Sequence, residues 1–192
     1  MLGLKLILYS FLAYWFTVLC YMFPWGKRNT NEIPDDCTRV CTVVLKNQLL
    51  YSGVYAIPLM YYPEETYSVV HALWQIPIII VLTDVIFYIA HYMMHTKWLY
   101  KRIHSTHHEY HVPIAAGALY AHPVEHIFVN LFSVVTPFFL VKAHPTTVLC
   151  WVPLISMNTV VSHSTAQKDD THGLHHRYRN CNYGVGFMLL DR

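Results

Sequence analysis

The chain has 192 residues, of which 55% are hydrophobic and only 12% are charged. Because a soluble domain usually carries about 25% charged residues, a membrane protein is the first class to test. The formal net charge of +2 gives no argument for nucleic acid as a partner. The five cysteines include no C-x-x-C pair, so neither a structural disulfide nor a cysteine-based zinc site is expected.

Two apolar runs lie in the first third of the chain. Residues 2–25 are numerous enough to cross a bilayer core of about 30 Å. A secretory signal peptide is the competing interpretation, which the length of the run, its Tyr and Trp content and the absence of a small-residue cleavage pattern disfavour. After a polar loop at 26–39, a weaker run covers 40–62, contains Lys46, and ends at the acidic turn 63–65.

Three further apolar runs follow. Residues 68–90 form the strongest of them, and a polar, histidine-rich stretch occupies 91–126. The runs at 127–141 and 145–161 are each short for a full span, so they predict a hairpin that enters the membrane and returns. We therefore expect an all-α integral membrane protein with about four transmembrane or membrane-inserted helices.

The basic residues predict an orientation in the membrane. They follow the first and third apolar runs and recur in the tail, at Lys27, Arg28, Lys97, Lys101, Arg102, Arg177 and Arg179. The positive-inside rule places all three segments on the cytoplasmic side. The same topology brings every histidine cluster to that membrane face.

The first histidine cluster, His91 and His95, continues the apolar run 68–90. An i, i+4 pair lies on one face of a helix. Asp84 precedes them on roughly the same face, and an acid inside an apolar span usually points into the protein interior. We expect Asp84 to support a ligand histidine by accepting its other ring N–H.

Two further clusters share the spacing H-x-x-H-H: His104, His107 and His108, and then His172, His175 and His176. Two clusters of identical spacing, preceded by H-x-x-x-H at a membrane exit, predict metal binding. His163, which emerges from the last apolar run, is a further candidate ligand. His122 is a candidate for supporting a ligand histidine without binding the metal itself.

The ligand type narrows the choice of metal. Imidazole suits zinc, copper, iron and nickel. Eight histidines in three clusters are too many for one tetrahedral zinc, which takes about four ligands, and they suit two metals with open coordination positions. Spacing alone leaves a site with two zinc ions open.

Two stretches around these clusters are distinctive: HTKWLYKRIHSTHHEYHVP with YAHPVEH after it, and the tail HGLHHRYRNCNYGVGFMLLDR. With the three clusters in this order they resemble the fatty acid hydroxylase and sterol desaturase superfamily, and the first stretch is most similar to the sterol 4-methyl oxidase branch. The likeness implies a catalytic domain at 68–192, with N-terminal spans and a connecting loop at 1–67. It also implies a di-metal cap on the cytoplasmic face of the endoplasmic reticulum membrane.

The resemblance carries a ligand set and a reaction class. The implied ligands are His91, His95, His104, His107, His108, His163, His172, His175 and His176. They would hold two iron ions, or zinc in a purified protein. The implied enzyme is a non-haem di-iron oxygenase that takes electrons from a haem-type carrier or its reductase. It would hydroxylate or desaturate a lipid with dioxygen, a methylsterol as the first choice and a fatty acyl chain as the second.

Two other classes of function stay open. A metal transporter needs ionisable residues spread through several spans, and here few, such as Lys46, His71 and Asp84, lie within them. A non-catalytic or zinc-binding membrane protein of the same fold is the alternative that metal analysis would separate from an oxygenase.

Overall fold

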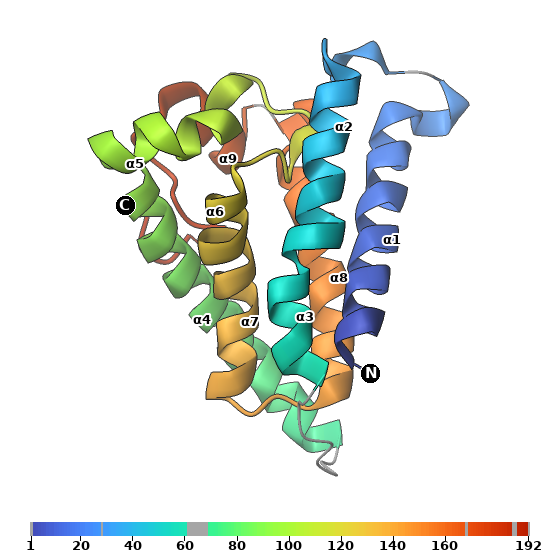
Figure 1. Ribbon diagram of the computed structural model, residues 1–192, viewed down its shortest axis with the longest axis vertical. Coiled ribbons are helices and arrows are strands. Elements are labelled where there is room, and N and C mark those ends of the chain that lie inside the picture. The colour runs from blue at the N-terminus through green and yellow to red at the C-terminus, as the bar shows by residue number, and fades with distance from the viewer. Residues whose placement is uncertain (1, 28, 61–68, 168, 186–187, 192) are drawn as a thin grey trace.

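The computed structural model describes residues 2–27, 29–60, 69–167, 169–185 and 188–191. Throughout that part of the chain every regular element is helical, as the sequence predicts (Figure 1). The α-helices are α1 (Leu2–Met22), α2 (Cys37–Lys46), α3 (Gly53–Met60), α4 (Val69–Met94), α5 (Lys97–Arg102), α6 (Pro123–Glu125), α7 (Phe132–Leu140), α8 (Pro145–Ser162) and α9 (Thr171–Tyr178). The shorter 3₁₀ and π segments are η1 (Pro24–Gly26), η2 (Thr30–Glu32), η3 (Asn47–Tyr51), η4 (His104–Glu109), η5 (Ala115–Gly117), η6 (His126–Leu131) and η7 (Thr165–Gln167).

Helices long and apolar enough to cross a membrane make up most of the described chain. There are 5 of them: Leu2–Met22, Cys37–Leu59, Leu73–Met94, Pro123–Leu140 and Pro145–Ser162. The sequence predicts about four. The difference arises in the final two runs, each of which has 18 residues here. Polar residues such as Glu125 and His126 belong to the fourth of these helices, so it begins earlier than its apolar run suggests.

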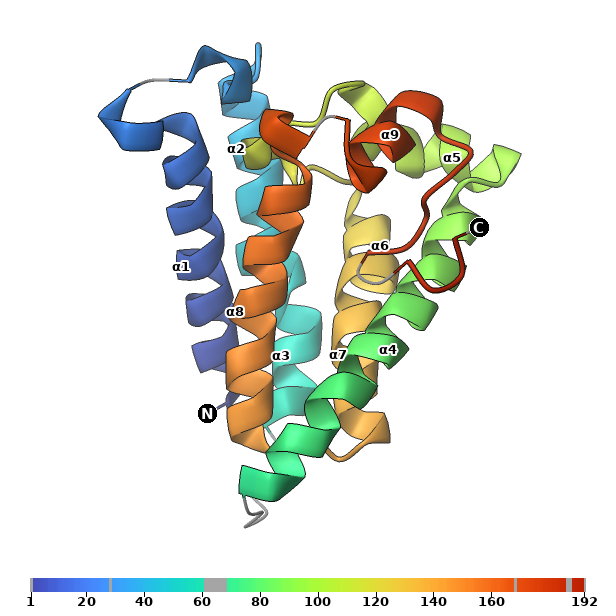
Figure 2. The same cartoon turned by 180° about the vertical axis from the view of Figure 1, so that it is seen from behind.

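The spans alternate in direction, so the polar connections that carry histidines gather at one end. In Figures 1 and 2, α5 and α9 lie at that end, and the N-terminus of α1 lies at the other. α1 packs along α8 and α3, and α4 packs along α7. The helices before and after residue 68 therefore form one bundle. The acidic turn expected at 63–65 falls outside the described residues.

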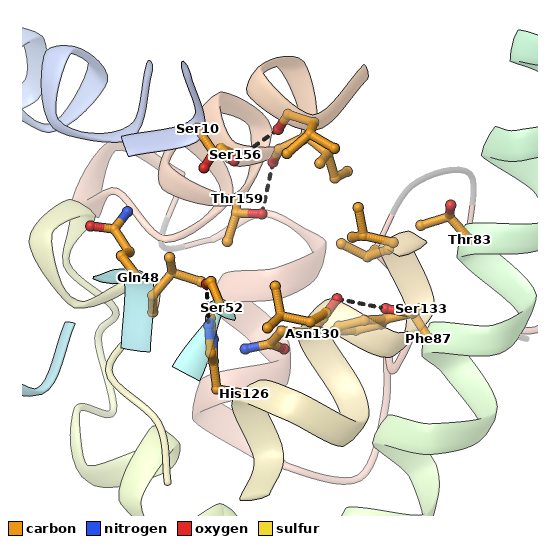
Figure 3. A pocket seen from close by; sticks show the side chains of 16 residues that line it. Ser10, Gln48, Ser52, Thr83, Phe87, His126, Asn130, Ser133, Ser156 and Thr159 are labelled. Carbon is orange, nitrogen blue, oxygen red and sulfur yellow. Dashed lines mark hydrogen bonds between the residues drawn. The ribbon is translucent and has the colours of Figure 1, made fainter. Parts of the chain in front are cut away.

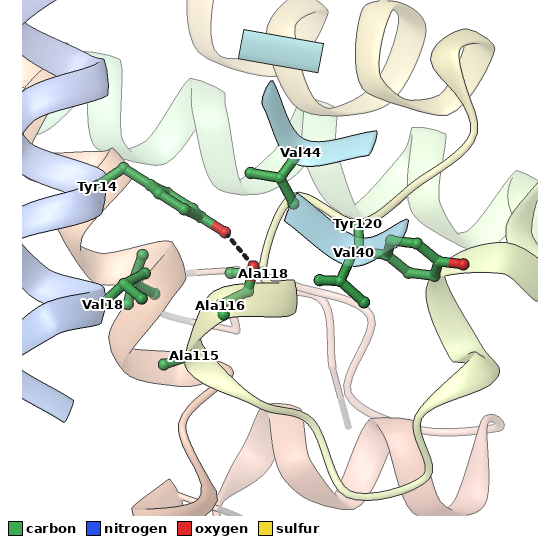
Figure 4. Packing of buried hydrophobic residues seen from close by; sticks show 9 residues of the cluster. Tyr14, Val18, Val40, Val44, Ala115, Ala116, Ala118 and Tyr120 are labelled. Atoms are coloured by element: carbon green, nitrogen blue, oxygen red, sulfur yellow. Dashed lines mark hydrogen bonds between the residues drawn. The ribbon is translucent and has the colours of Figure 1, made fainter. Parts of the chain in front are cut away.

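Tyr14 fixes α1 against the loop that precedes the fourth span. Its side chain is fully buried, its Oη donates to the carbonyl of Ala116 over 3.0 Å, and the same oxygen accepts from the Leu119 amide at 3.3 Å (Figure 4). A buried hydroxyl that both donates and accepts avoids the cost of an unmade hydrogen bond. This contact holds in place the segment that ends at Tyr120, beside the histidines.

A buried carboxylate joins three connections at the histidine end. Glu32 is fully buried, one of its oxygens accepts from the Ala115 amide at 2.7 Å, and the other accepts from the amide and hydroxyl of Thr165 at 2.7 and 2.8 Å. An acid buried this deeply is tolerated when its lone pairs are satisfied. Glu32 thus ties the first polar loop to the segments that flank His107 and His163.

Two spans are interrupted by π-helical turns, η3 in the second and η6 in the fourth. The two turns face one another, since Ser52 Oγ lies 3.3 Å from His126 Nε2. A π turn displaces the side chains that follow it around the helix, and such turns are frequent at functional sites. Here they bring polar side chains into the middle of an apolar bundle.

Candidate metal centre

Helix α4 places the first two histidines. Its apolar sequence continues to Met94, so His91 lies inside the last turns, 2% exposed, and His95 lies one turn later at the point where the helix ends. His91 packs edge-on against Phe87, with ring centroids 5.1 Å apart. The expected i, i+4 pair is therefore present, with both rings on the face of α4 that points into the molecule.

A first group of histidines converges on this pair: His91, His95, His104, His108 and His175. His104 is at its centre. Its Nε2 lies 3.1 Å from Nε2 of His91, 2.9 Å from that of His95 and 3.0 Å from that of His108. His175 from α9 closes the group, with its Nε2 3.1 Å from Nε2 of His108.

A second group lies beside the first: His107, His163, His172 and His176. His163 follows α8 directly, and its Nε2 lies 3.3 Å from Nε2 of His107 and 2.9 Å from Nε2 of His172. The two groups are neighbours, since the rings of His108 and His176, one from each group, have centroids 4.7 Å apart. All nine histidines that the sequence singles out as ligands thus lie in one of two adjacent groups.

The two H-x-x-H-H clusters are divided between the groups in complementary ways. In the cluster at 104–108, the outer pair His104 and His108 belongs to the first group and the middle residue His107 belongs to the second. In the cluster on α9, the outer pair His172 and His176 belongs to the second group and His175 belongs to the first. Successive residues are rotated by roughly 100° around a helix axis. The adjacent residues His107 and His108, and likewise His175 and His176, therefore turn toward different groups, and each cluster reaches both.

Protein oxygens orient the rings from behind. The Nδ1–H groups donate to backbone carbonyls: His91 to Tyr183 over 2.8 Å, His107 to Tyr120 over 3.3 Å, His163 to Thr159 over 2.7 Å, His175 to Cys181 over 2.7 Å and His176 to Tyr110 over 3.2 Å. A ring nitrogen that donates in this way leaves the other nitrogen deprotonated. These histidines therefore present Nε2 lone pairs to the interior of each group.

The facing lone pairs fit a bound cation. In the second group, His107 and His163 both donate through Nδ1, so their Nε2 atoms, 3.3 Å apart, have no proton to share. The buried Nε2 of His176 has no hydrogen-bond partner among the described residues. Lone pairs this close repel one another, and a metal ion between them converts the repulsion into coordination. The donor set is all imidazole, which suits iron, zinc, copper or nickel and excludes calcium and magnesium.

Burial holds these rings in the neutral form that binds metal. It lowers the pKa of His104 and His107 to about 3 and the pKa of His163 and His175 to about 4. Burial, followed by the neighbouring histidines, lowers the pKa of His95 to about 2. The same causes depress the pKa of His172 and His176 far below the ordinary range. At neutral pH the imidazoles therefore do not need to lose protons before they bind a metal.

Glu125 is a functional candidate that sequence reasoning missed. Its carboxylate is 2% exposed, and Oε1 lies 2.9 Å from Nδ1 of His104. A carboxylate behind a ligand histidine fixes the ring and makes it a stronger donor. The available signal was an acid between His122 and His126, at the start of an apolar run. The sequence pattern favours His122 for the supporting role instead.

His122 and Asp84 lie in different surroundings from those expected. His122 caps α6, where its Nδ1 accepts from the Val124 amide at 3.2 Å. The carboxylate of Asp84 accepts from the amides of Val185 at 3.2 Å and Leu189 at 2.9 Å, in the C-terminal tail. That tail supplies the carbonyl of Tyr183 to His91. Asp84 can therefore support His91 through the tail.

The comparisons with known proteins agree with this geometry. The family model described as fatty acid hydroxylase matches residues 76–192, which contain all nine histidines. The chain belongs to the fatty acid hydroxylase family. No solved structure matches the chain.

Among curated proteins, three relatives show the range of the family. Methylsterol monooxygenase 2-1 of Arabidopsis thaliana is 30% identical, over 86% of this chain and 72% of the relative. A very-long-chain aldehyde decarbonylase of Oryza sativa subsp. indica is 36% identical, over 61% of this chain and 50% of the relative. Human fatty acid hydroxylase domain-containing protein 2 is 32% identical, over 59% of this chain and 35% of the relative. The chain thus spans half or less of the second and third.

Proposed function

We propose that this protein is a membrane-bound oxygenase that holds two iron ions and oxidises a C–H bond of a lipid. The observation that carries the proposal is the convergence of nine histidines into two adjacent groups, one of five and one of four. Two groups of this kind match two metals better than one. Zinc held by the same residues, in a protein without redox activity, is the alternative.

Iron held in these groups would supply the activation of dioxygen, with electrons from a haem-type carrier or its reductase. The residues of this chain hold the metal, orient the ligand histidines and shield the site from water. Backbone carbonyls keep the Nε2 atoms aimed inward, Glu125 braces His104, and Phe87 covers His91 on the membrane side. Burial of the histidines keeps bulk water away from the reacting centre, so that the oxidant is spent on the substrate.

A lipid substrate is supported by the position of the histidines at one end of an apolar bundle, where a molecule can arrive from the bilayer. A methylsterol is our first choice and a fatty acyl chain the second. The names of the relatives cover a sterol oxidation and an aldehyde decarbonylation, so kinship alone leaves the substrate open. Hydroxylation and desaturation begin with the same hydrogen abstraction.

We place the histidine end on the cytoplasmic side of the endoplasmic reticulum membrane. Lys97, Lys101 and Arg102 lie in α5 at that end, in agreement with the positive-inside rule. Residues 68–192 would act as the catalytic domain. The spans within 1–67 would complete its walls, since Tyr14 and Glu32 hold the loops around the histidines.

Metal analysis joined to turnover tests the proposal. Protein purified anaerobically with iron supplied should contain about two irons per chain, and with reductant and dioxygen it should oxidise a 4-methylsterol or a fatty acyl lipid, read by mass spectrometry. His107→Ala, in the second group, should lose one metal and abolish turnover, because four donors are reduced to three. Full metal and full activity in that variant, or zinc without turnover in the unaltered protein, would refute the proposal.

A further inference from the structure

The segment that follows α9 is held first against α9 and then against α4. Arg179 and Asn182 adopt left-handed backbone conformations, with φ of 64° and 56°, and such residues let a chain change direction after a helix. The side-chain amide of Asn182 donates to a backbone carbonyl in the first turn of α9 over 2.9 Å. The next residues contact α4 instead, since the Val185 amide donates to Asp84 over 3.2 Å. Tyr183 therefore lies where the segment passes from one helix to the other (Figure 2).

Tyr183 contacts the first histidine group in two ways. Its backbone carbonyl accepts from Nδ1 of His91 at 2.8 Å. Its ring lies edge-on to the rings of His91, His95 and His175, with centroids 6.0, 5.0 and 5.4 Å away. All three rings belong to the first group. Tyr183 thus orients one candidate ligand through its backbone and covers three with its side chain.

Two carboxylates fix the backbone of this segment. Asp191 accepts from the Tyr183 amide through Oδ1 and from the Gly184 amide through Oδ2, both at 2.6 Å. Asp84 of α4 accepts from two further amides of the segment, at 3.2 and 2.9 Å. Hydrogen bonds to an ionised acceptor are roughly twice as strong as those between neutral groups. The position of Tyr183 therefore depends on the carboxylate of Asp191.

Gly184 leaves room for that carboxylate. A Cβ atom added at Gly184 would lie 2.7 Å from Oδ2 of Asp191 and 3.1 Å from Sδ of Met188. Both distances are shorter than the separation of about 3.5–4.0 Å at which non-bonded atoms attract one another best. The absence of a side chain at this position lets Asp191 lie against two successive backbone amides.

The same segment reaches a cavity of about 100 Å³ inside the bundle, shown in Figure 3. Val185 lines this cavity together with Phe87. Phe87 also packs edge-on against His91, with ring centroids 5.1 Å apart. Residues 183–185 thus contact the first group at one end and the cavity at the other. A shift of this segment would change the wall of the cavity as well as the orientation of His91.

The second group is oriented by other parts of the chain. Three of its four histidines donate through Nδ1 to backbone carbonyls, which belong to Tyr110, Tyr120 and Thr159. These carbonyls lie in the segments before the fourth span and in α8. The hydrogen bonds that Asp191 accepts therefore bear on the first group.

We infer that Asp191 is a positioning residue for the first histidine group. It fixes the backbone of Tyr183 and Gly184, and in this way it holds the carbonyl that orients His91 and the ring that covers the group. The inference rests on the proposed metal centre and deepens it, because it names a residue outside the ligand set on which one group depends and the other does not.

Titration of the metal-free, full-length protein in detergent with cobalt(II) tests the inference. Imidazole is a good ligand for this ion, and the visible absorption of cobalt changes with the geometry of its ligands, so the two groups should fill in two measurable steps. Asp191→Asn puts an NH₂ group, which cannot accept, against one of the two backbone amides. It should weaken one step by roughly 10-fold and change the absorption of that step alone.

The number of affected steps separates positioning from a general loosening of the fold. Helix α9 supplies histidines to both groups, so a variant that only loosened the histidine end would weaken both steps. Asp169→Asn is the matched control. It makes the same substitution just before α9, where the side chain is 71% exposed and lies 4.0 Å from Arg177. It should leave both steps unchanged.

Gly184→Ala is the second variant. It keeps Asp191 but displaces its carboxylate, so it should weaken the same step as Asp191→Asn. Unchanged cobalt affinity in Asp191→Asn, or equal weakening of both steps, would overturn the inference. If Asp191→Asn fails to fold, the same two outcomes in Gly184→Ala overturn it.

The two proposals can fail separately, because cobalt binding needs no redox chemistry. If one cobalt step is weakened as expected and the iron-loaded protein oxidises no lipid, the inference stands and the oxygenase proposal is wrong. If the variants bind cobalt like the unaltered protein and the iron-loaded protein oxidises a lipid, the oxygenase proposal stands and the inference is wrong. An unaltered protein that binds no cobalt would refute the metal centre and both proposals with it.

Discussion

At the scale of single residues, His104 is the central residue of the first group. Its Nε2 lies within 3.1 Å of Nε2 in three other histidines, and its Nδ1 faces the carboxylate of Glu125. His91 and His175 are instead held by neutral backbone carbonyls. A negative oxygen behind a ring raises its donor strength more than a carbonyl does. His104 should therefore be the strongest donor to a metal in this group.

Glu125→Gln tests that role. The variant should keep the fold and lower metal affinity by roughly 10- to 100-fold, because it removes the negative charge that lies 2.9 Å from Nδ1 of His104. A chelator titration of the purified protein measures the change. Glu109→Gln is the control, since the Glu109 carboxylate is next in sequence to His108 but pairs with Arg39 and Tyr120. Similar losses in both variants would speak against a specific role for Glu125.

Spacing was enough to single out eight of the nine histidines, because three such clusters in one chain are hard to credit to chance. His163 was singled out by its position after the last apolar run. Spacing could not divide them between two groups. That division depends on how η4 and α9 are turned toward one another, which is tertiary information. Glu125 was missed for a related reason. Its partner His104 lies in a different element, and no local spacing links the two. That these histidines bind iron stays a prediction.

At the scale of elements, close contact between α1 and α3 depends on one glycine. A Cβ atom built at Gly3 would overlap the carbonyl oxygen of Ala56. Small residues allow membrane helices to approach in this way. Gly53, in contrast, has no atom within 4 Å of the position where a Cβ would be added. The two glycines therefore differ in what they contribute to the bundle.

Gly3→Ala should lower stability by about 1–3 kcal/mol, as expected when extra volume is forced into a packed contact. The thermal midpoint of the detergent-solubilised protein gives the measure. Gly53→Ala should leave that midpoint unchanged or raise it slightly, since alanine favours a helix. A Gly3→Ala variant as stable as the unaltered protein would mean that α1 and α3 are not in this close contact.

Apolar runs predicted the first three spans well, because long stretches with few charges have few other uses. The fourth was underestimated, since polar residues needed inside the bundle shorten the apolar run that marks a span. Pro123–Leu140 includes Glu125 and His126 for this reason. The fifth has nearly the bounds of its apolar run, which was judged short for a span. The π turns η3 and η6 do not alter the hydropathy pattern, so the pattern does not predict them.

At the scale of the whole molecule, the histidines form a buried layer at one end of the bundle. Since burial depresses the pKa of His163 and His175 to about 4, the unfolded chain, with pKa values near 6.5, binds more protons at mildly acidic pH. Stability then rises with pH between these values. The contribution is complete above about pH 6.5 and is lost as pH falls toward 4.

Acidification of the metal-free protein tests whether its stability falls as the pH is lowered. After treatment with a chelator, the thermal midpoint should fall between pH 7.5 and pH 5, because the buried imidazoles must charge. Repeating the scan with saturating metal should move the fall to lower pH, since bound metal competes with protons. A metal-free midpoint that rises on acidification would contradict the burial of these rings as neutral groups.

The contribution of α9 to both groups has a consequence for biogenesis. α9 follows α8 in the chain, and it supplies His175 to one group and His172 and His176 to the other. Neither centre can be complete until α8 has entered the membrane. If the two groups hold metal as we propose, the metal is loaded after insertion. In a metal-starved cell the protein would accumulate as a fully inserted precursor that lacks the stabilisation from bound metal and is open to degradation by membrane quality control.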